Sequence, residues 1–562
     1  MTRSRSLTGG EAVVEALVAA GVRLAFTVPG ESFLGVLDAL HDAPIRTVAT
    51  RHEGGAAFMA EAVGQYSGRP AACLATRAVG AANLAIGLHT ARADSTPLIA
   101  LVGQVPRAFR GREAFQEVDQ VETFGRLCKA AAEVRDVGQA GPETARLLAI
   151  ATGGRPGPVL LALPEDLLEE TVAVPPPPDR GDREPALAPP RPPDAAGVRS
   201  VLTELAAASA PLIVCGAGVR RSGATEALHA LAEAALVPVV AAWRRPDSFD
   251  NEQPFYLGMT GLGAAPSVRE RLERADVVLA LGTRLNEIAT YDYALPGPAT
   301  RLVQVDLEPG FPGDRRQPDL AIAADAGAFL RLALDALAKE PDALGPHEPE
   351  VRRRAIAADR TAYVAASTPP QRPAGRAVDP AAVVRAVNEL LPADAVVTTD
   401  AGNFGGWYTR YLRIGPGQRF LGPTSGAMGY ALPAAIGASV AEPGRPIVAL
   451  AGDGGFGMLM AELETAVRER VRVAALVHDN SRYGTIRAYQ ERRHPGRVVA
   501  TELGALDFAA VAEACGARAL RVERDADVAP ALADAFAADG VTVVHLQLDR
   551  RRLSVDLTIE SD

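Results

Sequence analysis

The stretch PIVALAGDGGFGMLMAELETAVRERVRVAALVHDNSRYGTI, residues 446–486, decides the fold of this chain. Residues 447–451 form a short apolar run that ends at a glycine, which favours a buried parallel strand. The Gly-Asp-Gly-Gly sequence at 452–455 predicts a turn, and residues 458–467 carry apolar side chains at helical spacing. Residues 471–477 are a second β-branched run. The stretch therefore predicts a strand, a turn, a helix and a second strand, followed by a loop.

Two polar side chains follow the two predicted strands. Asp453 lies at the carboxyl end of the first strand and Asn480 at that of the second. If the strands are neighbours, their ends lie about 5 Å apart, and their oxygens could hold one hard cation at about 2.1 Å. Two side chains make no all-protein cage, so a magnesium ion here needs ligand oxygens, most naturally phosphates. Glycine amides and a helix N-terminus would bind the same phosphates.

Two other interpretations of this stretch stay open at this point. Gly452-x-Gly454-x-x-Gly457 fits the dinucleotide fingerprint, with Asp479 as the ribose-binding acid. Against it, Asp453 would place a carboxylate beside the pyrophosphate with no cation to offset its charge. An ordinary tight turn is the third interpretation, because a lone glycine pattern is weak evidence for a ligand site.

The composition describes an ordinary globular protein. The chain has 562 residues, enough for roughly three or four domains, of which 48% are hydrophobic and 22% charged. A net charge of −10 gives no indication of a nucleic-acid or anionic-membrane partner. No apolar run reaches the ~18 residues of a membrane span, and the N-terminus does not resemble a secretion signal. Four widely spaced cysteines, which predict a cytoplasmic protein with reduced thiols, are Cys73, Cys128, Cys215 and Cys515.

Breaks in composition divide the chain into three α/β segments. Residues 173–195 are proline-rich and polar, which predicts an extended linker. A second break leads into a segment, 346–375, that holds a helix-like run and a proline patch and is predicted as a second linker. The domains are then residues 1–172, 196–345 and 376–562. Strand-like runs alternate with helical patterns in each, so the predicted fold class is α/β with three doubly wound parallel sheets.

Smaller signals lie in the other segments. Glu53 follows a predicted strand, 45–49, near the start of a predicted helix at 56–66. Compensation of the helix dipole would explain an acid there without any function. In the middle segment, small residues at 216–218 and 282–283 follow strands, which suits either a nucleotide across a crevice or plain turns.

Taken together, the motifs resemble those of the thiamine diphosphate-dependent enzymes of the acetolactate synthase type. The resemblance covers nearly the whole chain. Its strongest match is the diphosphate signature, Gly452-Asp453-Gly454 with Asp479-Asn480 at the usual interval, although the family pattern has asparagine at 479. Further matches are RHEGGAAFMAEA (51–62), DSTPLIALVGQVP (94–106), AFQEVD (114–119), GRPGPVLLALPED (154–166), SGAMGYALPAAIGA (425–438) and the Glu-Leu-x-Thr-Ala of 462–466. The resemblance favours the metal–diphosphate interpretation of Asp453.

The resemblance implies a pyrimidine-binding, a central and a diphosphate-binding domain, with thiamine diphosphate and Mg²⁺ bound between two subunits. A homodimer is then the smallest active unit, and a homotetramer is common among relatives. The implied metal ligands are Asp453, Asn480 and the backbone carbonyl of Arg482. The implied cofactor-binding residues are Pro29, Gly30, Glu53, Gly402, Asn403, Gly426, Met428, Gly452, Asp453, Gly454, Gly455, Asn480, Tyr483, Gly484, Thr485 and Ile486.

The resemblance also assigns roles to single residues. Glu53 would hydrogen-bond the pyrimidine N1′ and so favour the tautomer whose 4′-nitrogen takes the thiazolium C2 proton. Gly426 would accept from the 4′-amino group, and Met428 would wedge between the two rings, although methionine also fills gaps in cores. Gln116, Phe115 and Lys129 match substrate-side positions. Glu462 matches an acid of the family and is named with Glu53 and Gln116 as catalytic, although a helix-face carboxylate would also explain it.

The central domain matches relatives that bind FAD. The implied FAD residues are Arg155, Gly216, Ala217, Gly218, Met259, Gly261 and Arg284. Thr260 departs from this pattern, because a histidine is usual at its position.

Several departures fall on the substrate side. Acetolactate synthases have methionine and tryptophan where this chain has Thr485 and Tyr489, and Ile288 replaces the arginine that reads the acceptor carboxylate. Glu31 stands where a second glycine is usual, and residues 77–80, Arg-Ala-Val-Gly, replace a Ser-Gly-Pro-Gly loop. We therefore expect decarboxylation of a small 2-oxo acid with carboligation, on substrates that need not be two pyruvates. The alternatives are a non-ligating decarboxylase or C–C lyase of the family and a non-catalytic, cofactor-binding relative.

Overall fold

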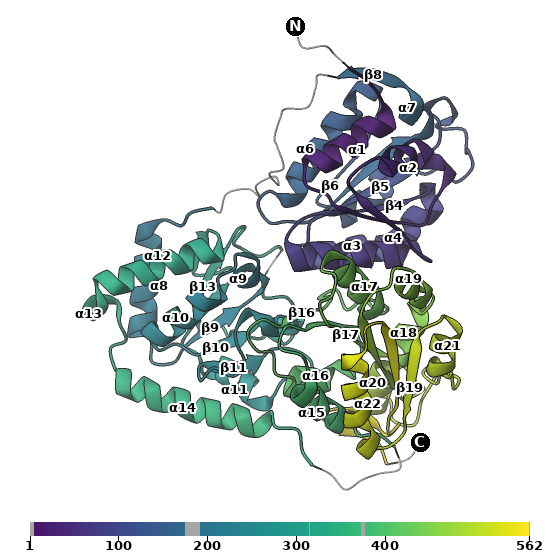
Figure 1. The fold of residues 1–562 in the computed structure, drawn as a ribbon. Coiled ribbons are helices and arrows are strands. Elements are labelled where there is room, and N and C mark those ends of the chain that lie inside the picture. Colours follow the sequence, from purple (N-terminus) through teal and green to yellow (C-terminus); the bar gives the residue numbers. More distant parts are fainter. Residues whose placement is uncertain (1–4, 175–190, 314, 372–376, 561–562) are drawn as a thin grey trace.

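The computed structural model describes residues 5–174, 191–313, 315–371 and 377–560, which form three α/β domains (Figure 1). Each domain is built on a six-stranded sheet whose strands are all parallel. The predicted fold class is therefore confirmed. None of the helices in the described ranges is both long and apolar enough to cross a membrane.

The N-terminal domain has helices on both faces of its sheet. Alternate residues of each strand enter two separate cores, as Phe26 and Ala25 do on neighbouring positions of one strand. In sheet order the strands are β3 (Arg46–Ala49), β2 (Leu24–Thr27), β4 (Ala71–Ala75), β5 (Leu98–Gln104), β7 (Pro158–Pro164) and β6 (Ala130–Glu133). The longer helices are α1 (Gly9–Ala19), α2 (Leu34–His41), α3 (Glu53–Ser67), α4 (Arg77–Asp94) and α6 (Ala140–Thr152), and the short ones α5 (Gln120–Phe124) and α7 (Glu165–Glu169). A small antiparallel pair, β1 (Arg5–Thr8) with β8 (Thr171–Val174), joins the two ends of the domain.

The central domain has the strand order of dinucleotide-binding folds, in which the chain starts in the middle and reverses direction there. In sheet order its strands are β11 (Tyr256–Met259), β10 (Val239–Ala241), β9 (Pro211–Cys215), β12 (Val277–Leu281), β13 (Arg301–Asp306) and β14 (Leu320–Ala323). Its helices are α8 (Ala195–Ala207), α9 (Ala217–Arg221), α10 (Thr225–Ala235), α11 (Pro266–Arg274), α12 (Ala326–Lys339), α13 (Pro341–Leu344) and α14 (Pro349–Ala366).

The C-terminal domain contains residues 446–486, with the predicted Asp453 and Asn480. In sheet order its strands are β16 (Arg419–Leu421), β15 (Val396–Thr399), β17 (Ile447–Gly452), β18 (Val473–Asp479), β20 (Val541–Gln547) and β19 (Arg518–Val522). A hairpin of β21 (Arg552–Ser554) and β22 (Leu557–Thr558) follows. The helices are α15 (Pro380–Leu390), α16 (Gly405–Tyr411), α17 (Ala431–Ala441), α18 (Asp453–Leu459), α19 (Glu462–Arg468), α20 (Gly484–Arg493), α21 (Phe508–Ala514) and α22 (Asp525–Ala537).

Three local predictions need correction. The turn predicted at 452–455 is already helix from Asp453, and the single helix predicted at 458–467 is two helices, α18 and α19, that break at residues 460–461. Glycines at 454 and 455 let the first turn of α18 pack closely against neighbouring side chains. An added Cβ would lie 2.7 Å from the Tyr483 ring at Gly454 and 2.3 Å from Asp400 Oδ2 at Gly455. Residues 77–80, predicted as a loop, are the first turn of α4.

The predicted linkers differ from the structure in the parts that can be compared. Residues 175–190 of the proline-rich segment lie outside the described residues. Within 346–375, helix α14 packs against the central domain through the fully buried side chain of Tyr363, whose ring contacts Tyr256 edge-on. The helix-like run predicted within this segment is thus helix α14, and it packs on the central core.

The N- and C-terminal domains share one continuous core. Helices α3 and α17 lie side by side between them (Figure 1). The ring of Phe58 meets that of Tyr430 edge-on at 5.3 Å, and an added Cβ on Gly437 would lie 2.5 Å from the carbonyl oxygen of Met59. Since α3 begins at Glu53 and α17 follows residues 425–430, this contact fixes two predicted site segments relative to each other.

A buried ion pair joins all three domains. The Asp94 carboxylate, at the end of α4, accepts hydrogen bonds from Arg245 of the central domain and from the amide and hydroxyl of Thr424 in the C-terminal domain. The Asp94 side chain is fully buried and that of Arg245 is only 7% exposed. Arg245 also donates to the carbonyl oxygen of Gly422. One carboxylate thus holds a point at which the three domains meet.

Removal of the cation at this junction should destabilise the fold. Arg245→Met leaves the Asp94 charge buried without its partner, which costs about 3–5 kcal/mol. The matched control is Glu143→Ala, which breaks the exposed Glu143–Arg146 pair and should cost no more than about 1 kcal/mol. Urea unfolding followed by fluorescence of Trp243 and Trp407 measures both. Coincident transitions for the two variants would contradict the role of the junction.

Candidate functional site

The carboxyl ends of three neighbouring strands meet at one edge of the C-terminal sheet. β15 lies between β16 and β17, and Gly452 of β17 is paired with His478 of β18. Asp453 and Asn480 therefore follow directly after adjacent strands, as the sequence predicted. β15 and β17 are also the strands between which the chain reverses its direction across the sheet, the position at which parallel α/β sheets bind ligands.

Among the residues that the structure describes, backbone amides and not a cationic side chain contact the Asp453 carboxylate. Its side chain is 7% exposed, Oδ1 accepts from the amide of Gly454 at 2.8 Å, and Oδ2 accepts from the amide of Arg482 at 3.2 Å. Burial, followed by the nearby Asp479 carboxylate, raises the pKa of Asp453 to about 7. An oxygen donor with this surplus of negative charge fits a divalent cation.

The loop after β18 turns the backbone toward Asp453. Asp479 accepts from the amide and hydroxyl of Ser481 and lies 2.8 Å from His545 Nε2. These contacts use the carboxylate that the dinucleotide interpretation assigned to a ribose, and they hold Ser481 in a left-handed conformation with φ of 52°. Through this turn the Arg482 amide donates to Asp453, so the backbone of residues 480–482 lies beside the Asp453 side chain. Among the residues that the structure describes, no cluster of three histidine, cysteine or acidic side chains could hold a metal.

Backbone groups surround this point on the other sides. Asn403 donates its side-chain amide to the carbonyl oxygens of Gly484 and Leu553, which ties the loop after β15 to the start of α20. Gly402 has a φ of 150°, Gly426 has a φ of 73° with open space where a Cβ would lie, and Met428 is half-buried beside it. Tyr483 packs on Gly454, and Thr485 and Ile486 lie in the first turn of α20. The residues present fit a bound cation with a phosphate group.

Asp400 is a site residue that the sequence prediction omitted. It is 1% exposed, Oδ1 accepts from the amide of Ala431, and Oδ2 has no hydrogen-bond partner among the described residues. Burial raises the pKa of Asp400 to about 7. Since it follows strand β15 as Asp453 follows β17, the strand-end signal that found Asp453 could also have found Asp400.

Glu53, Pro29 and Gly30 lie at the carboxyl edge of the N-terminal sheet, whereas Lys129 and Arg155 precede β6 and β7 at its amino edge. Glu53 is the first residue of α3, and the preceding His52 caps the helix by accepting from the amide of Gly54. Asn83 of α4, which the sequence prediction also omitted, donates to Glu53 Oε2 at 2.8 Å. Pro29 and Gly30 follow β2, where a Cβ on Gly30 would lie 2.7 Å from the side chain of Thr76.

Gln116 lies in a strained turn beside the start of α4. Its φ is 61°, its carbonyl oxygen accepts from the amide of Ala78, and its side-chain oxygen is buried without a partner among the described residues. Such strain persists at ligand sites. Phe115 next to it is 71% exposed. Lys129, in contrast, donates to the carbonyl oxygens of Ile150 and Gly153 at the end of α6.

Two of the departures from the family pattern contact each other. The Arg77 guanidinium lies 3.5 Å from Glu31, donates to Glu165 at 2.8 Å, and donates to the carbonyl oxygen of Phe115. Arg77 is 8% exposed and has a φ of 30°. This cluster could not be predicted from local sequence pattern, because the three side chains come from separate segments.

Glu462 of the C-terminal domain contacts the N-terminal domain directly before Glu53. Its Oε1 accepts from the amides of Arg51 and His52, and its Oε2 accepts from the hydroxyl of Thr465. Both carboxylate oxygens of this predicted catalytic residue are therefore engaged with the protein.

The predicted FAD residues of the central domain contact protein groups. Arg155 donates to Asp306 and Glu308, and Arg284 donates to the carbonyl oxygens of Arg92 and Ala93. The amides of Gly216 and Gly218 donate to the carbonyl oxygens of Leu281 and Gly282, and Ala217 between them begins α9. The sulfur of Met259 accepts from the amide of Arg244. Gly261 lies against the Trp243 ring and Ile288.

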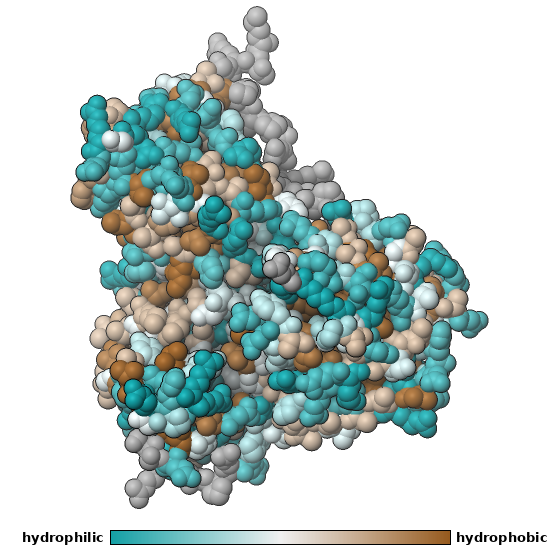
Figure 2. All heavy atoms as spheres, turned by 180° about the vertical axis from the view of Figure 1, so that it is seen from behind, coloured by the Kyte–Doolittle hydropathy of each residue, from teal (hydrophilic) through white to brown (hydrophobic). Residues whose placement is uncertain are grey.

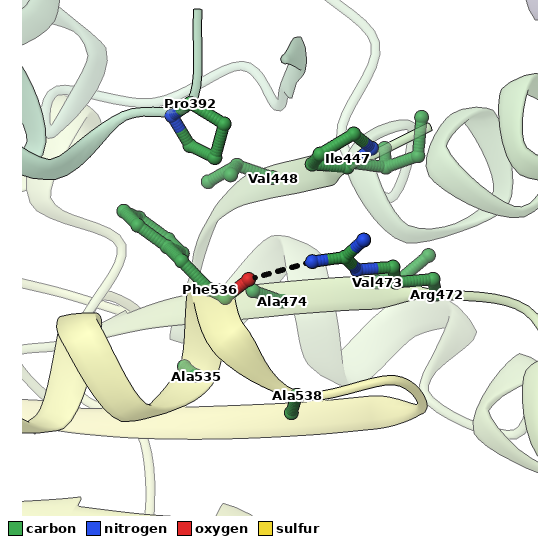
Figure 3. Close-up of a pocket in the computed structure, with 10 residues that line it drawn as sticks. Pro392, Ile447, Val448, Arg472, Val473, Ala474, Ala535, Phe536 and Ala538 are labelled. Carbon is green, nitrogen blue, oxygen red and sulfur yellow. Dashed lines mark hydrogen bonds between the residues drawn. The ribbon is translucent and has the colours of Figure 1, made fainter. Parts of the chain in front are cut away.

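A small pocket of about 10 Å³ lies at the opposite edge of the C-terminal sheet. Figure 3 shows Ile447, Val448, Val473 and Ala474 around it, with Arg472 donating to the carbonyl oxygen of Phe536. These residues are at the amino ends of β17 and β18, so the pocket is separate from the strand ends that carry Asp453 and Asn480.

Comparison with known proteins matches all three domains to one family. The matching models are described as the N-terminal TPP binding domain of thiamine pyrophosphate enzymes over residues 7–123, the central domain over residues 198–333, and the C-terminal TPP binding domain over residues 400–546.

Full-length relatives give the same result. The chain is 31% identical to a probable acetolactate synthase large subunit of Methanocaldococcus jannaschii, with 97% of this chain and 92% of the relative covered. It is 32% identical to an acetolactate synthase of Mycobacterium bovis, over 96% and 88%. It is also 32% identical to a sulfoacetaldehyde acetyltransferase of Castellaniella defragrans, over 97% and 94%. The chain therefore belongs to the thiamine pyrophosphate enzymes.

Proposed function

We propose that this protein decarboxylates a small 2-oxo acid and joins the remaining acyl unit to a second substrate, with thiamine diphosphate and Mg²⁺ as cofactors. The observation that carries the proposal is the buried Asp453 carboxylate, which backbone amides but no cationic side chain of the described residues contact, directly after the strand beside that of Asn480. The names of the relatives, acetolactate synthases and an acetyltransferase, support the same reaction class.

The C-terminal domain would hold the metal and the diphosphate. Asp453, Asn480 and the Arg482 carbonyl oxygen would bind Mg²⁺, which usually takes one or two carboxylates and ligand phosphates. The amides at the start of α18, with the glycines at 402, 452, 454 and 455, let a diphosphate approach the backbone closely. Asn403, Tyr483, Gly484, Thr485 and Ile486 would line the same region.

When bound, thiamine diphosphate supplies a nucleophilic carbon at thiazolium C2 and accepts electrons as carbon dioxide leaves. Glu53 would hold a proton at the pyrimidine N1′. Because Asn83 donates to Oε2, Oε1 is the oxygen left to contact the cofactor. Gly426 and Met428 would set the conformation of the cofactor, and Gln116 would contact the substrate.

Self-association as a homodimer or homotetramer would bring the two half-sites together. Figure 2 shows hydrophobic surface on the N- and C-terminal domains seen from behind. Exposed apolar side chains lie on α4, on the loop at 115, and on α18 and α20: Val79, Ile86, Phe115, Met458 and Ile486. A second copy would cover them. A cytoplasmic location is supported by the four free cysteines.

The substrate side differs from that of enzymes that join two pyruvates. Ile288 packs against Gly261 and offers no charge to an acceptor carboxylate, while Arg77 is held by two carboxylates. These observations favour an acceptor other than pyruvate, or the second candidate function, decarboxylation or C–C cleavage without ligation. The third candidate, a non-catalytic relative, is disfavoured by the presence of Glu53.

FAD stays a prediction. The two arginines and two of the glycine amides proposed to bind it are engaged with protein groups, so the fit is poor and no step is assigned to a flavin. The visible absorbance of the purified holoprotein would reveal one.

The proposed reaction and its alternatives predict different products, which one assay can distinguish. The purified protein with Mg²⁺, thiamine diphosphate and a panel of 2-oxo acids, alone and with aldehyde or 2-oxo acid acceptors, should release carbon dioxide and form a ligated product. Mass spectrometry of the products measures it. An aldehyde without ligated product would favour the second candidate, and no carbon dioxide from any donor would refute the proposal.

Metal-dependent cofactor binding should depend on Asp453 and Asn480. Asp453→Ala and Asn480→Ala should each weaken Mg²⁺-dependent binding of thiamine diphosphate by at least the roughly 10–100-fold that follows loss of a metal-supporting group. Asp534→Asn, which alters an exposed ion pair with Arg518, is the control. Isothermal titration measures the affinities, and variants that bind like the control would refute the assignment.

The same site predicts a pH dependence. Mg²⁺ binds the carboxylate form, and the pKa of Asp453 in the metal-free protein is raised to about 7. Protons therefore compete below that pH, and apparent Mg²⁺ affinity should fall up to about tenfold for each further pH unit. It should level off above that pH. An affinity that rises on acidification would contradict the assignment.

Glu53 should affect proton transfer more than binding. Glu53→Gln keeps the size of the side chain but changes its protonation, so exchange of the cofactor C2 proton should slow by about 10²–10⁴-fold. Cofactor affinity should change far less. Deuterium exchange followed by NMR measures the rate, and exchange at the wild-type rate would exclude the assigned role.

A further inference from the structure

Glu462 is a charged residue buried between two domains. It is the first residue of α19 in the C-terminal domain, and its side chain is fully buried. Oε1 accepts from the amides of Arg51 at 3.1 Å and His52 at 3.0 Å, both in the N-terminal domain, and Oε2 accepts from the hydroxyl of Thr465 at 2.6 Å. Three donors thus converge on one carboxylate, which offsets part of the cost of burying it.

The other polar contacts between α19 and this loop are exposed. Arg51 pairs with Glu464 at 2.9 Å, and Arg46 pairs with Glu469 at 2.8 Å, with arginine side chains that are 55% and 44% exposed. Surface pairs of this kind contribute about 0–1 kcal/mol each. Arg468 of α19 also donates to the carbonyl oxygen of Ala49, at an exposed position. Glu462 is therefore the buried contact of this set and binds the two amides that directly precede Glu53.

The shape of α3 accommodates this carboxylate. A Cβ on Gly55 would lie 2.4 Å from Glu462 Oε1 and 2.9 Å from its carboxyl carbon. Only glycine at 55 lets the Glu462 carboxylate reach the amides of residues 51 and 52. The first turn of α3 thus gives up helix propensity, about 0.5–1 kcal/mol for glycine relative to alanine, at the place where the carboxylate docks.

The residue that follows the two tethered amides is Glu53. Its backbone is held at residues 51 and 52 by Glu462 and at residue 54 by the His52 cap, and its side chain is held by Asn83. We propose that Glu462 is a positioning residue, which fixes the start of α3 from the neighbouring domain so that Glu53 meets the cofactor in one orientation. This inference rests on the proposed function, in which Glu53 contacts thiamine diphosphate.

A positioning role differs from a contribution to stability alone. If Glu462 only held the domains together, its loss would lower the unfolding temperature and leave folded, cofactor-saturated enzyme with normal proton exchange. If it orients Glu53, exchange in the saturated holoenzyme slows even where the protein is fully folded. A displacement of about 1 Å in a catalytic group can cost about 10²-fold in rate.

The test measures deuterium exchange at cofactor C2 in holoenzyme saturated with Mg²⁺ and thiamine diphosphate, below the unfolding temperature of each variant. Glu462→Ala should slow exchange about 10–10²-fold. Glu462→Gln should recover most of the rate, since its amide oxygen can accept from both backbone amides and its NH₂ group can donate to Thr465. Glu464→Ala, which removes only the exposed pair with Arg51, should stay within roughly twofold of wild type.

Gly55→Ala probes the same contact from the other domain and does not depend on how Glu462→Ala folds. The added methyl group favours the helix yet displaces the carboxylate, so exchange should slow as in Glu462→Ala while the helix itself is retained. Wild-type exchange rates in both Glu462→Ala and Gly55→Ala would overturn the inference. Absence of exchange in the wild-type holoenzyme would instead refute the proposed function.

Discussion

The structure depends on carboxylates buried where domains meet. Asp94 binds Arg245 and Thr424, Glu61 accepts from Tyr430, Thr96 and Gln65, and Glu462 accepts from two amides of the neighbouring domain. Burial and the nearby Asp94 charge raise the pKa of Glu61 to about 7. A buried polar group is costly without its hydrogen-bond partners, so these contacts favour the arrangement of the domains in which the partners are present.

Under the proposed function, that arrangement matters because the chemistry would be divided between domains. The groups that fit a metal and a diphosphate lie at the carboxyl edge of the C-terminal sheet, and Glu53 lies at the carboxyl edge of the N-terminal sheet. In the proposed function neither edge alone is a complete site. Packing of α3 on α17 and the hydrogen bonds of Glu462 connect the two edges within one chain, and the exposed apolar side chains near both edges are where a second chain would complete each site.

The sequence predicted those parts of the site that depend on local pattern. Asp453 and Asn480 each follow an apolar run, the two runs form neighbouring strands, and the pairing of these strands places both residues at the same edge of the sheet. The start of α18 at Asp453 was not predicted, because the two glycines after it usually indicate a turn and enter a helix here through contacts with Tyr483 and Asp400. The contacts of Glu462 could not be predicted, since they join backbone amides to a side chain more than 400 positions away. From sequence alone, a carboxylate on a predicted helix is expected to face solvent, and only the contact between the two domains shows that Glu462 is buried.

The pair formed by Arg77 and Glu31 shows how substitutions outside the shared motifs can be interpreted. A non-glycine residue at a φ of 30° carries strain of about 1–3 kcal/mol, and burying its guanidinium adds to that cost. Glu31, Glu165 and the Phe115 carbonyl oxygen offset part of it. Stability alone would favour glycine at this position, without the arginine or its two partners. The three side chains lie instead beside the turn that carries Gln116, so their identity is better explained by the substrate-side role proposed for this turn than by the fold. The departures from the acetolactate synthase pattern at 31 and 77 therefore form one contact, and a substitution at Arg77 would remove the cation that both Glu31 and Glu165 contact.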